Sequence, residues 1–350
     1  MIKVGIIGAG VIGRKRAAAI SAVGKGDEII TVCDIDFEKA KVLAEEYGSK
    51  IYTDWVDIVR DSKVECVIVA TPNKLLKDIS IAALNNKKNV LCEKPLGRNS
   101  EEAIEIFRKS NESGCVLKTG FNHRHHPAIF KAKQLIDASE IGSIYYLRCL
   151  YGHGGRPGYE KEWRASKDLC GGGELLDQGV HVVDLFRWFL GEFEEAFGQI
   201  NTYYWNMEVE DNAFAMFKTN AGQIAMMHTS WTQWKNKFIF EVFGEKGYLI
   251  IDGLGGSYGV ERLIIGRRKV EAVDPLSKNE RSFKYAGGPP DEELIEFPGP
   301  DISWQEEWKE FVSAIKENRE PLGSGYDGLM ANRMIEAVYK SAKLNKPVKI

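Results

Sequence analysis

The stretch GIIGAGVIG at residues 5–13 decides the fold of this chain. It follows a short apolar run at 3–7 and opens a helical pattern that begins at about Ile12. Three glycines stand in it at the GxGxxG spacing, namely Gly8, Gly10 and Gly13. A strand, a glycine-rich turn and a helix in this order are typical of a dinucleotide-binding βαβ unit.

Each glycine has its own physical task in such a turn. Gly8 permits the tight bend, Gly10 lets the backbone approach a pyrophosphate, and Gly13 lets the helix pack on the strand. The helix then presents its positive N-terminus to the phosphates. We therefore predict that this turn binds a dinucleotide, together with Val11 and Ile12 in the first helical turn. A glycine-rich turn without a ligand is the plainer alternative.

An acidic residue completes this pattern. Asp34 lies 21 positions after Gly13, at the end of the predicted strand Ile29–Cys33. Its carboxylate can accept hydrogen bonds from ribose hydroxyls and repels a 2′-phosphate, which predicts NAD rather than NADP as the cofactor. Basic residues at the start of the neighbouring helix act in the opposite direction, because they could favour the extra phosphate charge: Arg14, Lys15 and Arg16.

Short apolar runs alternate with helical patterns through the first third of the chain. This order predicts an α/β fold over residues 1–124, a Rossmann domain in which a doubly wound parallel sheet carries helices on both faces. The predicted strands are Lys3–Ile7, Ile29–Cys33, Cys66–Ala70, Asn89–Cys92 and Cys115–Gly120.

Two short polar stretches follow strands of this sheet. Ligands bind outside the carboxyl ends of strands in open α/β sheets, so the residues there should border the cofactor: Thr71, Pro72, Asn73, Glu93 and Lys94. Lys94 stands between an apolar strand and a proline, which makes it a candidate for chemistry rather than a solvated charge. Pro95 predicts a cis peptide bond.

After about residue 124 the pattern changes to longer alternating segments joined by short turns. It predicts that residues 125–350 form an α+β domain with a large, mainly antiparallel sheet. The predicted strands are Ile144–Tyr151, Ala196–Tyr204, Ala213–Lys218, Gln223–Trp231, Phe238–Phe243 and Tyr248–Ile251.

The second domain carries the sequence GGGELLDQGVHVVD at 171–184. If Leu175–Leu190 is one helix, Asp177, His181 and Asp184 fall within about 60° of one another and point away from its core face. Hydride transfer from an alcohol releases a proton, which a histidine is suited to accept near neutral pH. The structural alternative is that Asp177 favours the helix N-terminus and His181 is an ordinary i,i+4 partner.

Taken together, these motifs resemble those of the Gfo/Idh/MocA oxidoreductases. The resemblance covers nearly the whole chain through GAGVIG, ATPN, EKP, GFNHRHHP at 120–127, the glycine-rich stretch at 171–184, and GYDGLMANRMIEAVYKSA at 325–342. It implies an NAD-dependent dehydrogenase acting on a CH–OH group of a sugar, sugar nucleotide or cyclitol, and a homodimer or homotetramer. The chain departs from the family pattern at Leu76 and Arg16, where members often have histidine.

The resemblance also implies catalytic roles for the lysine of EKP and for the acid and histidine of the glycine-rich stretch. We predict that His181 is the general base and that Lys94 hydrogen-bonds the reacting oxygen. Asp177 then orients the substrate or supports the imidazolium, so that all three residues contact the substrate. Lys94 stays open as the alternative base.

The loop YGHGGRPGYEKEWR at 151–164 is the predicted segment for substrate choice. Arginine forks suit carboxylate or phosphate and aromatic faces suit a sugar ring, so Arg156, Trp163 and Arg164 favour a hexose derivative with an anionic group. A solvated basic loop is the alternative. Trp231 and Trp234 also suggest sugar stacking, but strand alternation favours the core for one of them.

The segment GFNHRHHP is predicted to cross between the domains past the nicotinamide. This path brings Asn122 toward the cofactor and Arg124 toward the substrate. The histidines at 123–126 alternate faces if the chain there is extended, and no acid or cysteine accompanies them at ligand spacing. The sequence therefore predicts no metal.

Composition limits the class of partner. A net charge of −3 over 350 residues gives no basic field for nucleic acid or an anionic membrane, so the partner is predicted to be a small molecule. No apolar run approaches the roughly 18 residues of a membrane span. The six cysteines are widely spaced and the chain starts directly in a predicted strand, which together predict reduced thiols and a cytoplasmic protein.

Three other functions stay open from the sequence. The first is an NAD-dependent glycoside hydrolase that oxidises a sugar transiently and regenerates NAD. The second is a non-catalytic NAD-binding sensor, which would need the dinucleotide site but not Lys94, Asp177 and His181 together. The third is reduction of an imine.

Overall fold

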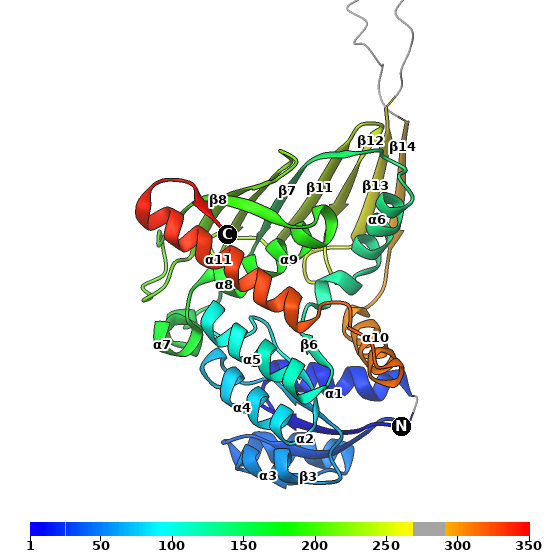
Figure 1. The fold of residues 1–350 in the computed structure, drawn as a ribbon, viewed down its shortest axis with the longest axis vertical. Coiled ribbons are helices and arrows are strands. Elements are labelled where there is room, and N and C mark those ends of the chain that lie inside the picture. The colour runs from blue at the N-terminus through cyan, green and yellow to red at the C-terminus, as the bar shows by residue number, and fades with distance from the viewer. Residues whose placement is uncertain (25, 269–290) are drawn as a thin grey trace, which may run out of the picture.

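The computed structural model describes residues 1–24, 26–268 and 291–350, and it shows two sheets with helices packed on them (Figure 1). The first sheet has six parallel strands in the order β3-β2-β1-β4-β5-β6. This confirms the predicted doubly wound parallel sheet. Its strands are β1 Lys3–Ile7, β2 Glu28–Cys33, β3 Lys50–Tyr52, β4 Cys66–Val69, β5 Asn89–Cys92 and β6 Leu117–Thr119, of which β3 is absent from the sequence prediction.

Apolar helix faces cover both sides of this sheet. The helices that follow its strands are α1 Val11–Val23, α2 Phe37–Tyr47, α3 Trp55–Arg60, α4 Asn73–Asn85 and α5 Ser100–Ser113. Side chains of α1 and α2 share one buried cluster with the strands, and those of α3, α4 and α5 share the other. The central strands β1, β4 and β5 therefore bury both of their faces, which explains why their sequences are almost continuously apolar.

The second sheet has nine strands in the order β14-β13-β12-β11-β7-β10-β9-β8-β15. All neighbours are antiparallel except β7 and β10, which confirms a mainly antiparallel sheet. The sequence prediction did not include β13, β14 and β15. The strands are β7 Ile144–Gly152, β8 Phe193–Asn201, β9 Asn212–Thr219, β10 Ile224–Ser230, β11 Lys237–Gly244, β12 Gly247–Asp252, β13 Glu261–Arg267, β14 Asp291–Phe297 and β15 Val348–Lys349.

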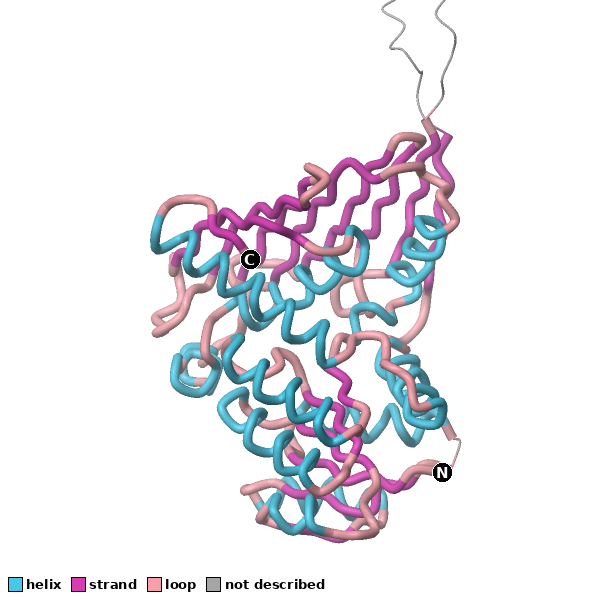
Figure 2. The backbone as a smooth tube through the Cα atoms, in the orientation of Figure 1, coloured by secondary structure: helices cyan, strands magenta, loops and turns pink. Residues whose placement is uncertain are grey.

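Helices pack on one face of the second sheet, on the side toward the parallel sheet (Figures 1 and 2). They are α6 Pro127–Asp137, α9 Gly179–Leu190 and α11 Gly325–Leu344, and they share one core with the strands. The short elements between these parts are η1 Asn122–His125, η2 Tyr159–Lys161, η3 Trp163–Ala165, α7 Lys167–Cys170 and α8 Glu174–Asp177.

Helix α10, Ser303–Glu317, joins the two halves of the chain. It follows the last long strand of the second sheet but packs against α1, beside the parallel sheet (Figure 1). Its side chains Trp308, Phe311 and Val312 belong to the buried cluster of α1 and α2. The division at residue 124 stays a prediction, and the core of the first half includes side chains from the far end of the chain.

The predicted helix Leu175–Leu190 is wrong as a single element. The chain forms α8 and α9 with Gln178 between them. Gly179, at the start of α9, packs closely, since a Cβ there would lie 3.1 Å from Cδ1 of Leu175. The predicted exposed ridge is also wrong, because His181 and Asp184 are both buried.

None of the helices in the described ranges, 1–24, 26–268 and 291–350, is long and apolar enough to span a bilayer.

Candidate active site

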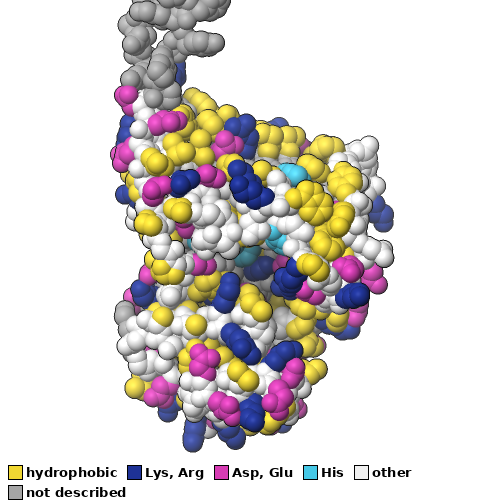
Figure 3. All heavy atoms as spheres, turned by 180° about the vertical axis from the view of Figure 1, so that it is seen from behind, with side chains coloured by type: hydrophobic (Ala, Val, Ile, Leu, Met, Phe, Trp, Pro, Cys, Tyr) yellow, Lys and Arg dark blue, Asp and Glu magenta, His cyan; other side chains and the backbone are white. Residues whose placement is uncertain are grey.

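A cleft of about 510 Å³ lies between the two halves of the protein. Its walls come from the start of α1, the end of β5, η1, β7, the loop at 153–164, α8 and α9, and the segments at 254–258 and 301–304. Figure 3 shows a hollow across the middle of the molecule, with histidine and basic side chains in it. Lys94, Asp177 and His181, which are distant in the sequence, all line this cleft.

The glycine-rich turn has the geometry of a phosphate cradle. A Cβ at Gly8 would lie 2.3 Å from the carbonyl oxygen of Ala70, and one at Gly13 would lie 1.8 Å from that of Gly8. These two glycines therefore serve close packing. Gly10 differs, because a Cβ there would meet nothing within 4 Å. Open space thus lies beside the backbone at the place where a pyrophosphate would approach.

The N-terminus of α1 fits an anionic ligand. Its N-cap is Gly10, which supplies no side-chain hydrogen bond, and its first turn contains no acidic residue. The amide groups there are therefore available to phosphate oxygens. Val11 is 73% exposed and lines the cleft with Ile12, as the cofactor prediction requires.

Asp34 is held beside this turn at the end of β2. Its Oδ2 accepts a hydrogen bond from the backbone N–H of Ala9 at 2.7 Å, and its Oδ1 accepts one from Asp36 at 2.9 Å. A carboxylate fixed at this edge of the sheet fits the hydroxyls of an adenosine ribose. These residues match the cofactor site that the sequence predicts.

Arg16 is unavailable to a 2′-phosphate. It is buried, and its guanidinium pairs with Glu93 at 2.6 Å and with Glu307 of α10. Glu93 lines the cleft beside Lys94 in the EKP motif, and its ion pair with Arg16 fixes the position of its carboxylate. The expectation that Arg16 could favour NADP is therefore wrong, whereas Lys15 does line the cleft.

The residues after β4 lie less directly on the cleft than predicted. Asn73 is buried and donates a hydrogen bond through Nδ2 to the carbonyl oxygen of Cys170 at 2.8 Å, so it joins α4 to α7. Thr71 and Pro72 are half-buried, and the Thr71 hydroxyl has no hydrogen-bond partner among the described residues. None of the three lines the cleft, and their cofactor contacts stay a prediction.

Lys94 is clamped by Asp177. Its Nζ donates to the backbone oxygen of Asp177 at 2.6 Å and to Oδ1 at 2.8 Å. The other carboxylate oxygen lies 3.3 Å from Nε of Arg164. Burial alone would raise the pKa of Asp177, but the positive charges of Lys94 and Arg164 hold it below its usual range. The Lys94–Pro95 peptide bond is cis, which confirms the sequence prediction.

His181 lies buried on the same wall. Its ring stacks on that of His123 with centroids 3.8 Å apart, and its Nδ1 has no hydrogen-bond partner among the described residues. Burial, and then the positive charge of Lys94, lower the pKa of His181 well below its ordinary value. The imidazole is therefore neutral near pH 7 and able to accept a proton.

A hydrogen-bonded row continues from this stack. Nδ1 of His123 lies 3.2 Å from Oδ1 of Asn122, and Nε2 lies 3.1 Å from the hydroxyl of Tyr151. Across the cleft, Nε2 of Gln178 donates to the Tyr258 hydroxyl at 3.0 Å. Asn122 also lines the cleft, and its Nδ2 donates a hydrogen bond to Oγ of Ser303.

Sequence reasoning missed most of the polar residues on this wall. Five of them lie in stretches that the sequence analysis quotes, but no local spacing marks them there as site residues: His123, Tyr151, His153, Tyr159 and Gln178. The other three lie outside every quoted stretch, and they are Ser257, Tyr258 and Asp301.

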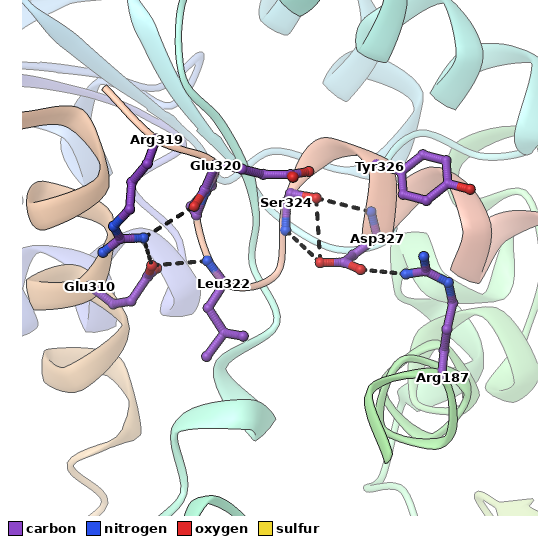
Figure 4. Close-up of a pocket in the computed structure, with 9 residues that line it drawn as sticks. Arg187, Glu310, Arg319, Glu320, Leu322, Ser324, Tyr326 and Asp327 are labelled. Atoms are coloured by element: carbon purple, nitrogen blue, oxygen red, sulfur yellow. Dashed lines mark hydrogen bonds and ion pairs between the residues drawn. The ribbon is translucent and has the colours of Figure 1, made fainter. Parts of the chain in front are cut away.

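Arg124 does not reach the cleft, and its predicted substrate contact is therefore wrong. It is buried, and it bonds Asp184 through Nε at 2.8 Å and Asp327 through Nη1 at 3.2 Å. Figure 4 shows the far side of this cluster, where Asp327 caps the first turn of α11 and pairs with Arg187. Arg124, Asp184 and Asp327 together hold η1, α9 and α11 to one another.

The loop at 151–164, which is predicted to choose the substrate, has fewer unpaired cationic side chains than its composition suggests. Arg156 lines the cleft, but Glu162 accepts two hydrogen bonds from its guanidinium, at 2.7 and 2.6 Å. Arg164 also lines the cleft and pairs with Asp177. Trp163 lies outside the cleft lining and packs against the small buried cluster around Trp231, which is the core tryptophan that strand alternation predicts.

The sequence analysis assumed an extended chain for the histidine-rich segment, and this assumption is wrong. It forms the 3₁₀ helix η1, after which Nδ1 of His126 lies 3.1 Å from Glu261. Within the part of the chain that the structure describes, no group of three or more histidine, cysteine, aspartate or glutamate side chains is arranged to hold a metal ion.

A dinucleotide cradle that faces a neutral histidine and a clamped lysine defines a nicotinamide-dependent oxidoreductase. Two family models match the chain. Residues 2–121 match the oxidoreductase family with an NAD-binding Rossmann fold, and residues 129–250 match the GFO/IDH/MocA C-terminal domain. The chain belongs to the Gfo/Idh/MocA family of NAD-binding oxidoreductases.

Several curated proteins are similar over their full length. An inositol 2-dehydrogenase of Rubrobacter xylanophilus is 26% identical over 357 residues, covering 100% of this chain and 93% of that protein. A levoglucosan dehydrogenase of Pseudarthrobacter phenanthrenivorans is 26% identical over 97% of this chain and 96% of its own length. A 1,5-anhydro-D-fructose reductase of Ensifer adhaerens is 28% identical, with 99% and 98% covered.

Solved structures share the fold. A levoglucosan dehydrogenase in complex with NADH and L-sorbose superposes with a TM-score of 0.87 at 23% identity, covering 100% of this chain and 99% of that one. GenD2 from gentamicin A biosynthesis, in complex with NAD, gives a TM-score of 0.81 at 24% identity, with 100% and 96% covered.

Proposed function

We propose that this protein is an NAD-dependent dehydrogenase that oxidises a hydroxyl carbon of an uncharged sugar or cyclitol. The observation that carries the proposal is the convergence of Lys94, Asp177 and His181 in one cleft beside the dinucleotide cradle. Relatives named inositol 2-dehydrogenase and levoglucosan dehydrogenase support this substrate class.

The chain's own residues supply the proton chemistry. Bound NAD accepts a hydride at its nicotinamide ring, and the substrate hydroxyl must lose a proton as this occurs. His181 takes that proton, because its ring is neutral and lines the cleft. Lys94 directs a positive charge at the reacting oxygen, where negative charge develops. Asp177 holds Lys94 in place through two contacts.

The same geometry favours His181 over Lys94 as the base. Two of the three donor positions of the Lys94 ammonium are used by Asp177, and the third is then free for the substrate oxygen. A lysine paired in this way acts as a donor. This pairing supports His181 as the base, between the two candidates that the sequence leaves open.

The ion pairs of the substrate loop are the argument for an uncharged substrate. The guanidinium of Arg156 is matched by Glu162, and that of Arg164 pairs with Asp177, which it shares with Lys94. A carboxylate or phosphate on the substrate would have to displace one of these partners. The proposal therefore departs from the anionic hexose derivative that the loop composition favours.

The test is the formation of NADH, followed by its near-ultraviolet absorbance, with purified protein, NAD and a panel of free sugars, inositols, uronates and sugar nucleotides. We expect a signal with a neutral sugar or an inositol. In His181→Ala, kcat should fall by roughly 10² to 10⁴, the usual contribution of a general base, while NAD affinity stays nearly unchanged. An equal loss of turnover and NAD binding would contradict the role of His181.

A silent panel would have a different meaning. If NAD binds but no NADH accumulates with any substrate, the redox-neutral glycoside hydrolase or the sensor replaces the dehydrogenase. Release of sugar from a glycoside without net NADH would identify the hydrolase.

We also propose that the protein is a homodimer or homotetramer in the cytoplasm. Residues that lie opposite each other on neighbouring strands point to the same face of a sheet. One row of such residues crosses the uncovered face of the second sheet: Phe197, Met216, Met226, Arg148, Glu241, Ile250, Ile264 and Leu294. A row that is apolar at both ends fits an interface between copies. Six free cysteines, five of them buried, suit a reducing compartment.

A further inference from the structure

A group of exposed aromatic side chains stands beside the cleft and has no role in the mechanism above. Trp234 and Tyr204 are each 63% exposed, and their ring centroids lie 4.8 Å apart at an interplanar angle of 83°. We call this pair the outer aromatic pair. Large aromatic side chains are usually buried, so two in contact on the surface require an explanation.

Two hydrogen bonds fix the segment of Trp234 to the edge of the cleft. On one side, the backbone N–H of Gln233 donates to the carbonyl oxygen of His153 at 3.1 Å. On the other side, Nδ2 of Asn236 donates to the carbonyl oxygen of Ser257 at 2.9 Å. His153 and Ser257 both line the cleft. Trp234 therefore lies between two cleft-lining segments, at the rim of the site that holds His181.

The backbone at Trp234 is unusual. Its φ is +55°, in the left-handed region that a bulky residue rarely adopts. Close packing accompanies this conformation, because a Cβ at Gly154 would lie 3.2 Å from Cα of Trp234. Strained backbone of this kind is concentrated at functional sites, where it fixes the direction of a side chain.

Tyr204 is also held rigidly. The buried carboxylate of Asp211 accepts hydrogen bonds from the backbone N–H groups of Tyr203, Tyr204 and Trp205, at 2.8, 2.8 and 3.0 Å. Nε1 of Trp205 adds a bond to the carbonyl oxygen of Trp231 at 3.0 Å. The loop that presents Tyr204 is thus fixed before any ligand arrives, which reduces the entropy cost of binding.

From these observations we infer that the outer aromatic pair is a second sugar-binding subsite, and that the substrate is a glycoside or disaccharide. One ring reacts beside His181 while the next ring stacks on Trp234. The inference rests on the proposed sugar dehydrogenase function. It is supported by the continuity of the pair with the cleft, and by the pairing of Arg156 with Glu162, which occupies that guanidinium.

The chemistry of a sugar ring fits such a surface. A pyranose has an apolar face of C–H groups and a polar rim of hydroxyls, and an aromatic ring can cover the apolar face while the hydroxyls stay in water. A free monosaccharide held at His181 would leave Trp234 uncovered. A two-ring substrate would cover it.

The first test compares two-ring and one-ring substrates. Wild type, Trp234→Ala and Tyr145→Ala are assayed for kcat/KM with glucose, galactose and their methyl glycosides, and with cellobiose, maltose and lactose. Tyr145 is exposed but does not line the cleft, so it is a matched control. We expect the two-ring to one-ring ratio of kcat/KM to fall about tenfold in Trp234→Ala, as loss of one aromatic contact would give, and to stay constant in Tyr145→Ala.

A second measurement separates this inference from the proposed function. Saturation-transfer NMR on the His181→Ala protein with NAD reports saccharide binding without turnover. Stronger binding of a disaccharide than of its monosaccharide, lost on adding Trp234→Ala, supports the subsite even if no substrate is oxidised. An unchanged ratio in both measurements overturns it. So does a change of molar mass in Trp234→Ala, since the pair would then contact a second copy of the chain.

Discussion

At the scale of single residues, the cleft keeps histidine neutral and aspartate charged. Burial removes water from both side chains, which disfavours the charged form of each. For His181 the nearest charge is the positive Lys94, which acts in the same direction as burial. For Asp177 the same lysine, together with Arg164, acts against burial and prevails. Lys94 therefore favours the unprotonated form of both side chains, the neutral imidazole and the charged carboxylate.

This arrangement predicts the pH dependence of turnover. The lowered pKa of His181 means that the ring stays unprotonated, and so able to act as a base, at pH values where an exposed histidine is already charged. We expect kcat/KM to stay level as the pH falls through about 6.5 and to decline only at lower pH. Stopped-flow or steady-state NADH formation across pH 4.5–8.5, in buffers of about constant ionic strength, measures the profile. An acid limb centred at or above about 6.5 would rule out a buried, neutral His181 as the base.

At the scale of secondary structure, the sequence motifs predicted which elements lie side by side, but not which partners their side chains contact. Gly8, Gly10, Gly13 and Asp34 lie where the sequence places them, because a tight turn and a strand end are local features. The break at Gln178 could not be predicted in this way, since no glycine or proline stands at that position. The buried position of the Arg124 side chain depends on its ion pair with Asp327, which lies about 200 residues away in the sequence.

The Arg124 cluster predicts a large effect on stability. Arg124→Ala would leave the buried carboxylate of Asp184 without this cation and Asp327 with Arg187 alone, and it would remove the ion pairs that join η1 to α9 and α11. We expect a loss of about 3–5 kcal/mol in the free energy of unfolding, measured by urea denaturation with circular dichroism.

The control for this prediction is Arg262→Ala, which removes an exposed pair with Glu296. It should leave the midpoint of unfolding nearly unchanged, because exposed ion pairs contribute little. Equal effects of the two substitutions would show that the Arg124 cluster is not a structural element of the core.

At the scale of the whole molecule, the sequence predicted two layered halves and missed the strands at the edge of the second sheet. The runs that form β13 and β14 are short and interrupted by charged residues, as in Glu261–Arg267 and Asp291–Phe297. Such edge strands resemble loops in composition. The uncovered face of this sheet is equally invisible to the sequence, because it exists only once nine strands have paired.

That face predicts the oligomeric state. Met216 and Met226 are neighbours near one apolar end of the row, and both are exposed. Met216→Glu would place a charge in the proposed interface, which should shift the protein from a dimer or tetramer toward a monomer at micromolar concentration. Light scattering after size-exclusion chromatography measures this shift. A substitution at Leu75, which is exposed on α4, is the control; a wild-type protein that is already monomeric contradicts the proposal.

The return of α10 to the first half has a consequence for how the enzyme opens. Trp308 and Phe311 are buried against α1 and α2, and Arg16 ties the same helix to the EKP strand through Glu307 and Glu93. Rotation of one half of the protein against the other would have to break this buried packing and both ion pairs of Arg16. Any opening of the cleft is therefore restrained on the side of α10.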